Sequence, residues 1–461
     1  MSNRYNTAEL QRLDAAHHLH PFTNHKSLRA AGARVIVHAD GPYFWDSEGR
    51  RVLDGMSGLW TTSVGAGRKE LADAAYTQLL ELPYYNTFFQ TTHPRVVELS
   101  AKLASIAPAG MKNVFYGSSG SESNDTAIRL IRYYWAAIKG EPKRRIIIGR
   151  RYGYHGSTIA ATSMGGMELM HGQMYPLYEG FRHVMEPYWY GNSAEGETPE
   201  AFGLRAAKAI EDEILAVGPE NVAAFAGEPV QGAGGLKIAP STYWPAVQKV
   251  VDKYGILLLA DEVITGFGRL GTWFASDFYG IRPDIVTFAK AATSGYIPLS
   301  GILVGDRVAG ALERHDDEFY HGYTYSGHPV ACAVALKNIE IIERERLVDR
   351  VKSFGAPRLA AMLAKFKDHP LVGEVRSVGM LGALELVANK KRRQRFADVG
   401  RVGTICRNHF AREGYIMRAI GDTMVTAPPF IMTEENFQEA EGVIAKVLDL
   451  TLNDVRGELA A

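Results

Sequence analysis

The sequence predicts an α/β protein with a mostly parallel central sheet in a large domain, and a smaller α+β domain built from both termini. Short aliphatic runs alternate with helical segments between residues 113 and 304, which is typical of strands buried under helices on both faces. At 461 residues the chain also exceeds what one hydrophobic core usually organises. We expect a large domain at 71–330 and a small domain formed by 1–70 and 331–461.

The expected strands of the large domain are short apolar runs separated by turn-forming residues. They lie at residues 114–116, 145–149, 222–226, 256–260, 285–288 and 301–304. Helices are expected at 121–137, 199–217 and 243–254, the second with Pro199 near its start, where a missing N–H costs little.

After residue 329 the pattern changes to that of the small domain. A long apolar-periodic helix should run to about residue 346 and leave the large domain. Further helices and short strands follow at 373–386 and 415–426, and an amphipathic helix begins at Thr433.

The composition narrows the class of partner. Lysine plus arginine (51) equal aspartate plus glutamate (51), so no overall charge favours nucleic acid or an anionic membrane. The first nine residues contain no apolar signal region, and no apolar stretch approaches the roughly 20 residues that span a bilayer. We expect a cytoplasmic protein with a small-molecule partner. Cys332 and Cys406 lie in apolar helical patterns and should be reduced core residues.

Two neighbouring strand ends carry the strongest functional signal. The aliphatic run at 256–260 ends in Asp261 and Glu262, and the run at 285–289 ends in Lys290. Open α/β sheets bind ligands at the carboxyl ends of their strands. An acid on one strand end and an amine nucleophile on the next suit pyridoxal 5′-phosphate, provided that desolvation helps Lys290 to lose its proton.

A serine- and glycine-rich segment, Gly117 to Asn124, follows a strand and opens a helix. Its N–H groups and hydroxyls would converge at a positive helix end that suits a phosphate. Taken alone, the segment would be better explained as an ordinary helix cap. Beside Asp261 and Lys290, we interpret it as the phosphate site.

Three other patterns point to different functions and fail on context. The strand ending in Asp-Glu resembles that of an ATPase, but the sequence lacks Gly-x-x-x-x-Gly-Lys-[Ser/Thr]. The Gly-x-Gly-x-x-Gly at 266–271 lies five residues after its strand, and a poor helix sequence follows it. The histidines at 17, 18 and 20 could suggest a metal, but we identify no Cys or carboxylate at ligand spacing and expect a packed, metal-free N-terminal segment.

The chain resembles the class III pyridoxal-phosphate aminotransferases, and within them the ω-transaminase branch that passes amines to pyruvate. The resemblance runs from about Leu13 to the C-terminal helix. It implies pyridoxal-phosphate fold type I. Its motifs are DAAHHLHP at 14–21, GLW at 58–60, YGYHGST at 152–158, GEPVQG at 227–232, ADEV at 260–263 and HGYTYSGHP at 321–329.

The resemblance implies that Lys290 carries the cofactor and that Asp261 holds the pyridine nitrogen. The other cofactor-binding residues that it implies are Ser119, Gly120 and Ser121 at the phosphate, Tyr154 and Val263 at the ring, Glu228 near Asp261 and the ring oxygen, His155, and Thr324 from a neighbouring subunit. The active site would then exist only in a homodimer, or in a tetramer built from such dimers.

The resemblance also implies a substrate pocket. Its aromatic lining would be Trp60, Phe88, Tyr154 and Tyr323, and Arg418 would bind the keto-acid carboxylate as a mobile clamp. The chain departs from the family at Ala226, where a bulky aliphatic is usual, and at 291–292, where Ala-Ala replaces Gly-Leu.

We expect transfer of an amino group from a primary amine to pyruvate, which leaves as alanine. A same-fold aminomutase or decarboxylase is the alternative, and a non-catalytic ligand sensor is a further one. The sequence does not decide whether the natural amine donor is a polyamine such as putrescine, an ω-amino acid or an arylalkylamine.

Overall fold

Within residues 5–459, which the computed structural model describes, the large domain is built on a seven-stranded sheet of order β4-β10-β9-β8-β7-β5-β6. Among these strands only β10 runs antiparallel to its neighbours, so the predicted mostly parallel sheet is confirmed. The strands are β4 (Met111–Gly117), β5 (Ile146–Arg150), β6 (Phe181–Val184), β7 (Val222–Gly227), β8 (Leu257–Asp261), β9 (Ile285–Phe288) and β10 (Ser300–Gly305).

One strand of this sheet, β6, was not predicted. It has four residues, with Arg182 exposed, and pairs only with β5 at the edge of the sheet. An edge strand of this length buries too few side chains to show a clear apolar pattern. The six predicted strands all form, with ends shifted by no more than a few residues.

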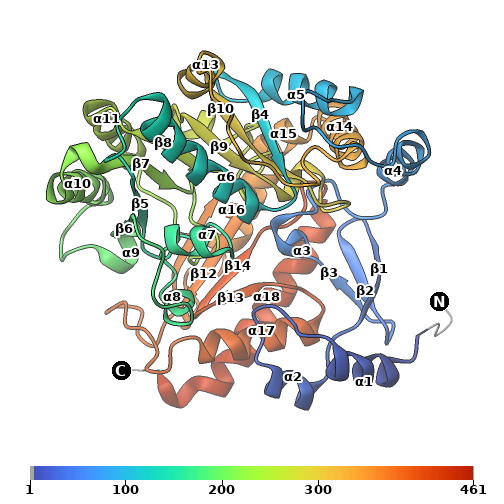
Figure 1. Ribbon diagram of the computed structural model, residues 1–461. Coiled ribbons are helices and arrows are strands. Elements are labelled where there is room, and N and C mark those ends of the chain that lie inside the picture. Colours follow the sequence, from blue (N-terminus) through green and yellow to red (C-terminus); the bar gives the residue numbers. More distant parts are fainter. Residues whose placement is uncertain (1–4, 460–461) are drawn as a thin grey trace.

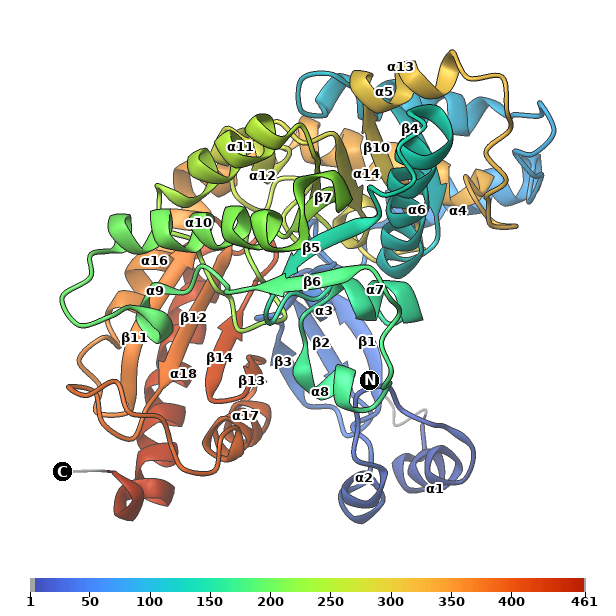
Figure 2. The same cartoon turned by 60° about the vertical axis from the view of Figure 1, so that its left-hand side comes forward.

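Helices cover both faces of the sheet (Figures 1 and 2). On one face α6 (Gly120–Tyr133) and α13 (Asp306–Glu313) pack against Leu257 and Leu259. On the other, α10 (Pro199–Val217) and α11 (Tyr243–Tyr254) pack against Leu258, and α5 (Pro94–Ile106) and α14 (Pro329–Arg344) share a core with Ala260. Side chains alternate between the two faces along a strand. The side chain of Asp261 therefore lies on the same face of the sheet as Leu257 and Leu259, which is the face covered by α6.

The helix boundaries follow local signals. α10 begins at Pro199 after a Thr198 cap, and α11 ends at Tyr254, before Gly255 in the left-handed conformation. The bounds of both helices are as predicted. The helix expected at 121–137 is α6 followed by a π-helical turn, Tyr134–Ile138. The long helix α14 ends at Arg344 because the left-handed backbone of Arg346 (φ 50°) starts a new helix.

The remaining helices and turns are short or belong to the outer layers. Around the large domain they are α4 (Lys69–Glu81), α7 (Ile159–Met164), α8 (Glu168–Gly172), α9 (Trp189–Asn192), Pro219–Asn221, α12 (Ala275–Tyr279) and the 3-10 turn Lys290–Ala292. Elsewhere they are α1 (Thr7–His17), α2 (His25–Ala31), α3 (Ser57–Trp60), α15 (Leu347–Arg350), Val351–Gly355, α16 (Ala356–Ala364), α17 (Arg401–Glu413), α18 (Glu434–Val455) and Arg456–Glu458.

Both ends of the chain contribute to one further core. A four-stranded antiparallel sheet contains β11 (Val372–Val378), β12 (Leu381–Leu386), β14 (Thr423–Thr426) and β13 (Arg418–Ile420), and a three-stranded one contains β1 (Ile36–Asp40), β2 (Tyr43–Asp46) and β3 (Arg51–Leu53). Leu53, Val64 and Leu71 pack in one cluster with residues of the C-terminal segment as far as Val455. The boundaries at 70 and 330 stay a prediction, and residues 1–4 and 460–461 lie outside the described part.

The Gly-x-Gly-x-x-Gly segment joins the two parts of the molecule. Its Arg269 donates to the carbonyl of Pro428 at 2.6 Å and to the hydroxyl of Ser63 at 3.1 Å, and it lies 4.5 Å from the centre of the Phe430 ring. Gly268 has φ +101°, a conformation that favours glycine. The glycines in this segment therefore shape a buried connecting loop.

The N-terminal helices differ from expectation. Neither α1 nor α2 has a buried residue, and both views show them at the lower edge of the molecule (Figures 1 and 2). His17 and His18 are exposed, so the prediction that this segment is packed was wrong. Cys332 and Cys406 are buried free thiols, as predicted. No helix within residues 5–459 has both the length and the apolar character needed to cross a membrane.

Candidate active site

Asp261 ends β8 as a fully enclosed carboxylate, 3% exposed. His155 Nδ1 donates to one of its oxygens at 2.7 Å, and the side-chain amide of Asn124, on α6, donates to the same oxygen at 2.9 Å. Burial alone would raise the pKa of Asp261, but the hydrogen bond and charge of His155 and the bond from Asn124 outweigh it and hold the pKa below its ordinary value. The site thus keeps an anion away from water.

The neighbouring acid, Glu262, points away from this anion. It accepts from the N–H groups of Ala275 and Ser276 at 2.5 and 2.7 Å and from the Ser276 hydroxyl at 2.6 Å. Its carboxylate therefore caps α12 on the opposite side of the strand. Of the two acids at this strand end, Asp261 alone faces the candidate site.

Lys290 follows β9 and starts a 3-10 turn with a left-handed backbone (φ 46°). Asn338, buried on α14, holds this turn by donating to the carbonyls of Ala291 and Ala292 at 2.9 and 3.1 Å. Ala291 has no left-handed backbone, so this position does not require glycine. Alanine in place of the family's usual glycine is therefore accommodated at position 291.

The Lys290 amine makes no ion pair within the described residues, although Asp261 and Glu228 lie close enough to influence it. Burial lowers the pKa of this amine to about 8; the two carboxylates oppose the shift and the Arg418 charge adds to it. A lysine with this pKa loses its proton far more readily than an exposed one. Amine and carboxylate therefore face a common space without neutralising each other.

The phosphate-type segment forms an open helix end. Ser119 caps α6 by accepting from the Glu122 N–H at 3.2 Å, while no hydrogen bond in residues 5–459 uses the N–H groups of Gly120 or Ser121. A Cβ on Gly120 would lie 3.2 Å from both Val263 methyls, and one on Gly156 would lie 2.5 Å from the Ser121 hydroxyl. Glycine at both positions therefore brings this helix end close to Val263 and the strand ends.

Glu228 lies behind Asp261 and is also buried. Its carboxylate accepts from the N–H of Tyr154 at 3.1 Å and from that of Gly232 at 3.0 Å. Burial raises the pKa of this carboxyl, and the charges of His155 and of the buried Arg150 oppose the shift. Glu228 therefore fixes the backbone that carries Tyr154 and His155.

The opposite wall comes from other parts of the chain. Trp60 is buried, and the Arg418 guanidinium carbon lies 5.0 Å from its ring centre, with the Lys290 amine at 5.9 Å. Arg418 is the first residue of β13. Phe22, which we did not predict, lies 6.4 Å from the Tyr154 ring. The one sequence feature that could have indicated Phe22 is its position directly after the HHLHP motif at 17–21.

The other two aromatic residues lie elsewhere in the single chain. Phe88 packs against Gly322, and Tyr323 donates to the carbonyl of Glu122 at 3.2 Å. The carbonyl of Thr324 accepts from Tyr84 at 2.7 Å. No ring contact within residues 5–459 joins Phe88 or Tyr323 to Trp60 or Tyr154. One chain therefore brings together only part of the predicted site.

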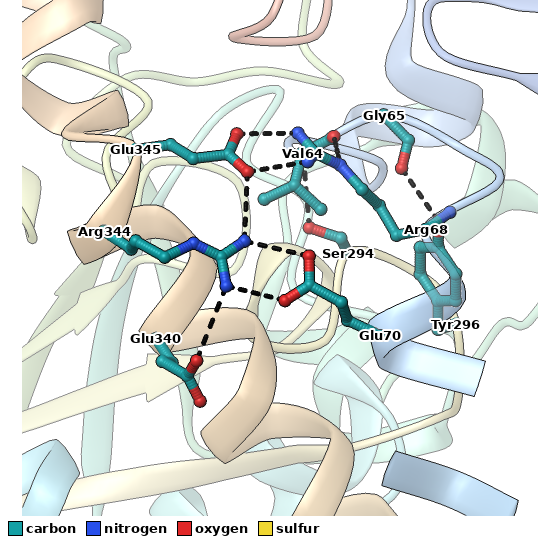
Figure 3. Close-up of polar contacts among 9 residues, drawn as sticks. All are labelled: Val64, Gly65, Arg68, Glu70, Ser294, Tyr296, Glu340, Arg344 and Glu345. Carbon is teal, nitrogen blue, oxygen red and sulfur yellow. Dashed lines mark hydrogen bonds and ion pairs between the residues drawn. The ribbon is translucent and has the colours of Figure 1, made fainter. Parts of the chain in front are cut away.

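A polar network ties Tyr296, in the segment after the Lys290 turn, to the segment that follows Trp60 (Figure 3). Tyr296 accepts from the Arg68 N–H at 2.7 Å and donates to the Gly65 carbonyl at 3.0 Å. Arg68 binds both oxygens of Glu345 at 2.7 and 2.8 Å. These contacts fix the positions of the two segments relative to each other and to the end of α14.

The same network extends to α4 (Figure 3). Arg344 binds both oxygens of Glu70 at 2.6 and 2.8 Å and contacts Glu345 at 3.3 Å. Paired two-point contacts of this kind are more specific in geometry than single ones. Sequence reasoning missed the network because its partners are up to 277 residues apart.

The arrangement defines a class of protein first. A desolvated lysine, a buried anionic aspartate and an open helix end on one edge of a mostly parallel sheet fit an enzyme that uses pyridoxal 5′-phosphate. The lysine would bind the cofactor covalently, the aspartate would pair with its ring nitrogen, and the helix end would bind its phosphate.

Comparisons with known proteins then give the family. The family model described as Aminotransferase class-III matches residues 26–448. The putrescine–pyruvate aminotransferase of Pseudomonas aeruginosa is 52% identical over 445 residues, 96% of this chain and 97% of that protein. The chain belongs to the class III aminotransferases, which use pyridoxal phosphate.

Solved structures agree with this assignment. A thermostable (S)-enantioselective omega-transaminase from Thermomicrobium roseum superposes with TM-score 0.94 at 44% identity, over 97% of this chain and 99% of that one. An omega-transaminase from Pseudomonas jessenii in complex with PMP has TM-score 0.95 at 39% identity, with coverage of 97% and 99%. The predicted family, cofactor and fold type are confirmed.

The network in Figure 3 allows a stability test. Glu345→Gln should lower the free energy of unfolding by about 1–3 kcal/mol, because the partly buried Arg68 loses its charged partner. The melting temperature of the holoenzyme measures this. Asp73→Asn is the matched control, since its pair with Lys69 is exposed and should contribute only about 0–1 kcal/mol. Equal shifts in the two variants would contradict the role of the network.

Proposed function

We propose that the protein transfers an amino group from a primary amine to pyruvate and releases alanine. The observation that carries this proposal is an arginine without an acid partner beside a buried lysine. Within residues 5–459 the Arg418 side chain makes no salt bridge, yet it is half-buried over Trp60 and close enough to Lys290 to affect the pKa of that amine. The similarity to a putrescine–pyruvate aminotransferase supports the choice of amine and acceptor.

Pyridoxal phosphate supplies an electron-withdrawing ring that stabilises negative charge on the substrate carbon. Asp261 would keep the ring nitrogen protonated, because the lowered pKa of this buried carboxyl holds it in its anionic form. Lys290 Nζ would move the proton from the substrate carbon to the cofactor carbon in one half-reaction and in the opposite direction in the other. Positioned proton transfer of this kind contributes typically about 10²–10⁴-fold. Tyr154 and Val263 would hold the ring between them, while Ser119, Gly120 and Ser121 would bind the phosphate.

Arg418 would bind the carboxylate of the keto acid. Its burial lowers the pKa of the guanidinium, which is the cost of holding a charge out of water. A carboxylate from the substrate would relieve that cost through a two-point contact. An uncharged amine brings no such partner, so the arginine must turn away when an amine binds.

A donor panel tests the proposed reaction. Putrescine, an ω-amino acid and an arylalkylamine are each incubated with the holoenzyme and pyruvate, and alanine is measured. We expect alanine to form with at least one donor, and less product when 2-oxoglutarate replaces pyruvate. Amine consumption without alanine would favour the aminomutase or decarboxylase alternative. No conversion of any donor would favour a ligand sensor.

An apolar surface supports assembly as a homodimer. Tyr76, Leu80, Tyr85 and Phe89 are exposed on α4 and the loop after it, Phe89 to 88%. An apolar surface of this extent usually marks a protein interface. It adjoins Thr324 through the Tyr84 contact, which would let Thr324 and Phe88 reach the site of a second subunit. The cytoplasmic location expected from the sequence stays a prediction.

If Thr324 completes the neighbour's phosphate site, cofactor binding and dimerisation must be linked. Binding that requires both chains stabilises the dimer by mass action. On dilution, apoenzyme should dissociate at a higher concentration than holoenzyme, as measured by sedimentation velocity. Thr324→Ala should reduce this difference. Equal dimer stability with and without cofactor would place the phosphate site within one chain.

Arg418→Ala should separate the two half-reactions. The loss of a buried charge contact should weaken pyruvate turnover by about 2–5 kcal/mol in kcat/KM. Single-turnover reaction with an arylalkylamine should stay nearly intact. Arg418→Lys keeps the charge but not the fork, and should restore only part of the loss. Equal damage to both half-reactions would mean that Arg418 is structural.

A further inference from the structure

The end of α1 gathers three side chains that sequence reasoning had separated. His20 Nε2 lies 2.8 and 2.9 Å from the two oxygens of Asp14, and His18 Nδ1 lies 3.1 Å from one of them. The two imidazole rings are 4.2 Å apart between centres. We had found no carboxylate at ligand spacing, and this was wrong, because Asp14 precedes His18 by one helical turn.

The three side chains offer one ligand atom each, all within 4.8 Å of one another. Zinc-to-ligand bonds of about 2.0–2.2 Å place the ligand atoms of a tetrahedral site roughly 3.4 Å apart. The contacts at Asp14 need only a slight opening to reach that spacing. His18 is exposed and His20 half-buried, so a water molecule has access to a fourth position.

We propose that Asp14, His18 and His20 form a binding site for a divalent transition-metal ion such as Zn²⁺. Two imidazole nitrogens and one carboxylate suit zinc and its neighbours, whereas magnesium and calcium prefer oxygen ligands alone. The hydrogen bonds seen among the three side chains hold them together in the metal-free protein, and the ion replaces the shared protons.

The site connects to the active site through a short piece of chain. Phe22 follows His20 by two residues, has a left-handed backbone (φ 50°) and contacts the ring of Tyr154 at 6.4 Å. Neither flanking helix has a buried residue that could anchor it. An ion on His20 therefore fixes the turn that places Phe22 against Tyr154.

Calorimetric titration of the untagged holoenzyme with Zn²⁺ tests the site. We expect one ion per chain, and binding at least about tenfold weaker in each of Asp14→Asn, His18→Gln and His20→Gln. His17→Gln is the matched control, because it removes a histidine of the same segment that lies outside the cluster. Mg²⁺ should not compete. Absence of zinc binding, or binding that these three variants leave unchanged, would overturn the proposal.

Hydrogen–deuterium exchange provides a second readout, independent of activity. Zn²⁺ should slow exchange in a peptide covering residues 14–22 of the wild type, because the ion holds both ends of that turn. The same peptide in His20→Gln should show no change. Slower exchange in both proteins would place the bound ion elsewhere and would also overturn the proposal.

Discussion

The structure depends on keeping an anion and an amine buried close together without letting them pair. A direct ion pair would hold Lys290 protonated and occupy the Asp261 carboxylate. The lysine could then not act as a nucleophile, and the aspartate could not pair with the ring nitrogen. The fold avoids this by giving Asp261 its own partners, His155 and Asn124, and by leaving Lys290 without one. Because an unpaired charge is costly to bury, the pKa of the amine falls to about 8, and the amine loses its proton more readily than that of an exposed lysine.

The large sheet separates the two acids at the end of β8, and the core formed by both ends of the chain positions the opposite wall of the site. Strand alternation sends Asp261 toward α6 and Glu262 toward α12, so one acid serves the site and the other anchors a helix. Trp60 and Arg418 come from segments associated with the other core. Their position relative to Lys290 depends on a few polar contacts. Among these are the ion pair of Arg68 with Glu345 and the hydrogen bond from the buried Arg269 to the carbonyl of Pro428.

The sequence predicted what is encoded locally. The bounds of helices α10 and α11 were predicted correctly, the first with Pro199 as the signal for its start. Strand β6 was missed because an edge strand shows little periodicity. The direction of Glu262 and the joining of Arg68 to Glu345 were beyond prediction, because both depend on partners distant in sequence. The Asp14 cluster was different, since its spacing of one helical turn was present in the sequence and was overlooked.

The residues around the cofactor and those around the substrate differ in their local structure, and the difference bears on specificity. Asp261 ends a strand and Lys290 directly follows one, where packing on both faces fixes them. Trp60 and Phe22 lie outside the strands; like Lys290 (φ 46°), they have left-handed backbones, at φ 58° and 50°. Such conformations cost of order 1–3 kcal/mol and persist only when the surroundings impose them. The amine pocket is therefore set by tertiary contacts of segments outside the strands, and the donor can change while the chemistry at the strand ends stays the same.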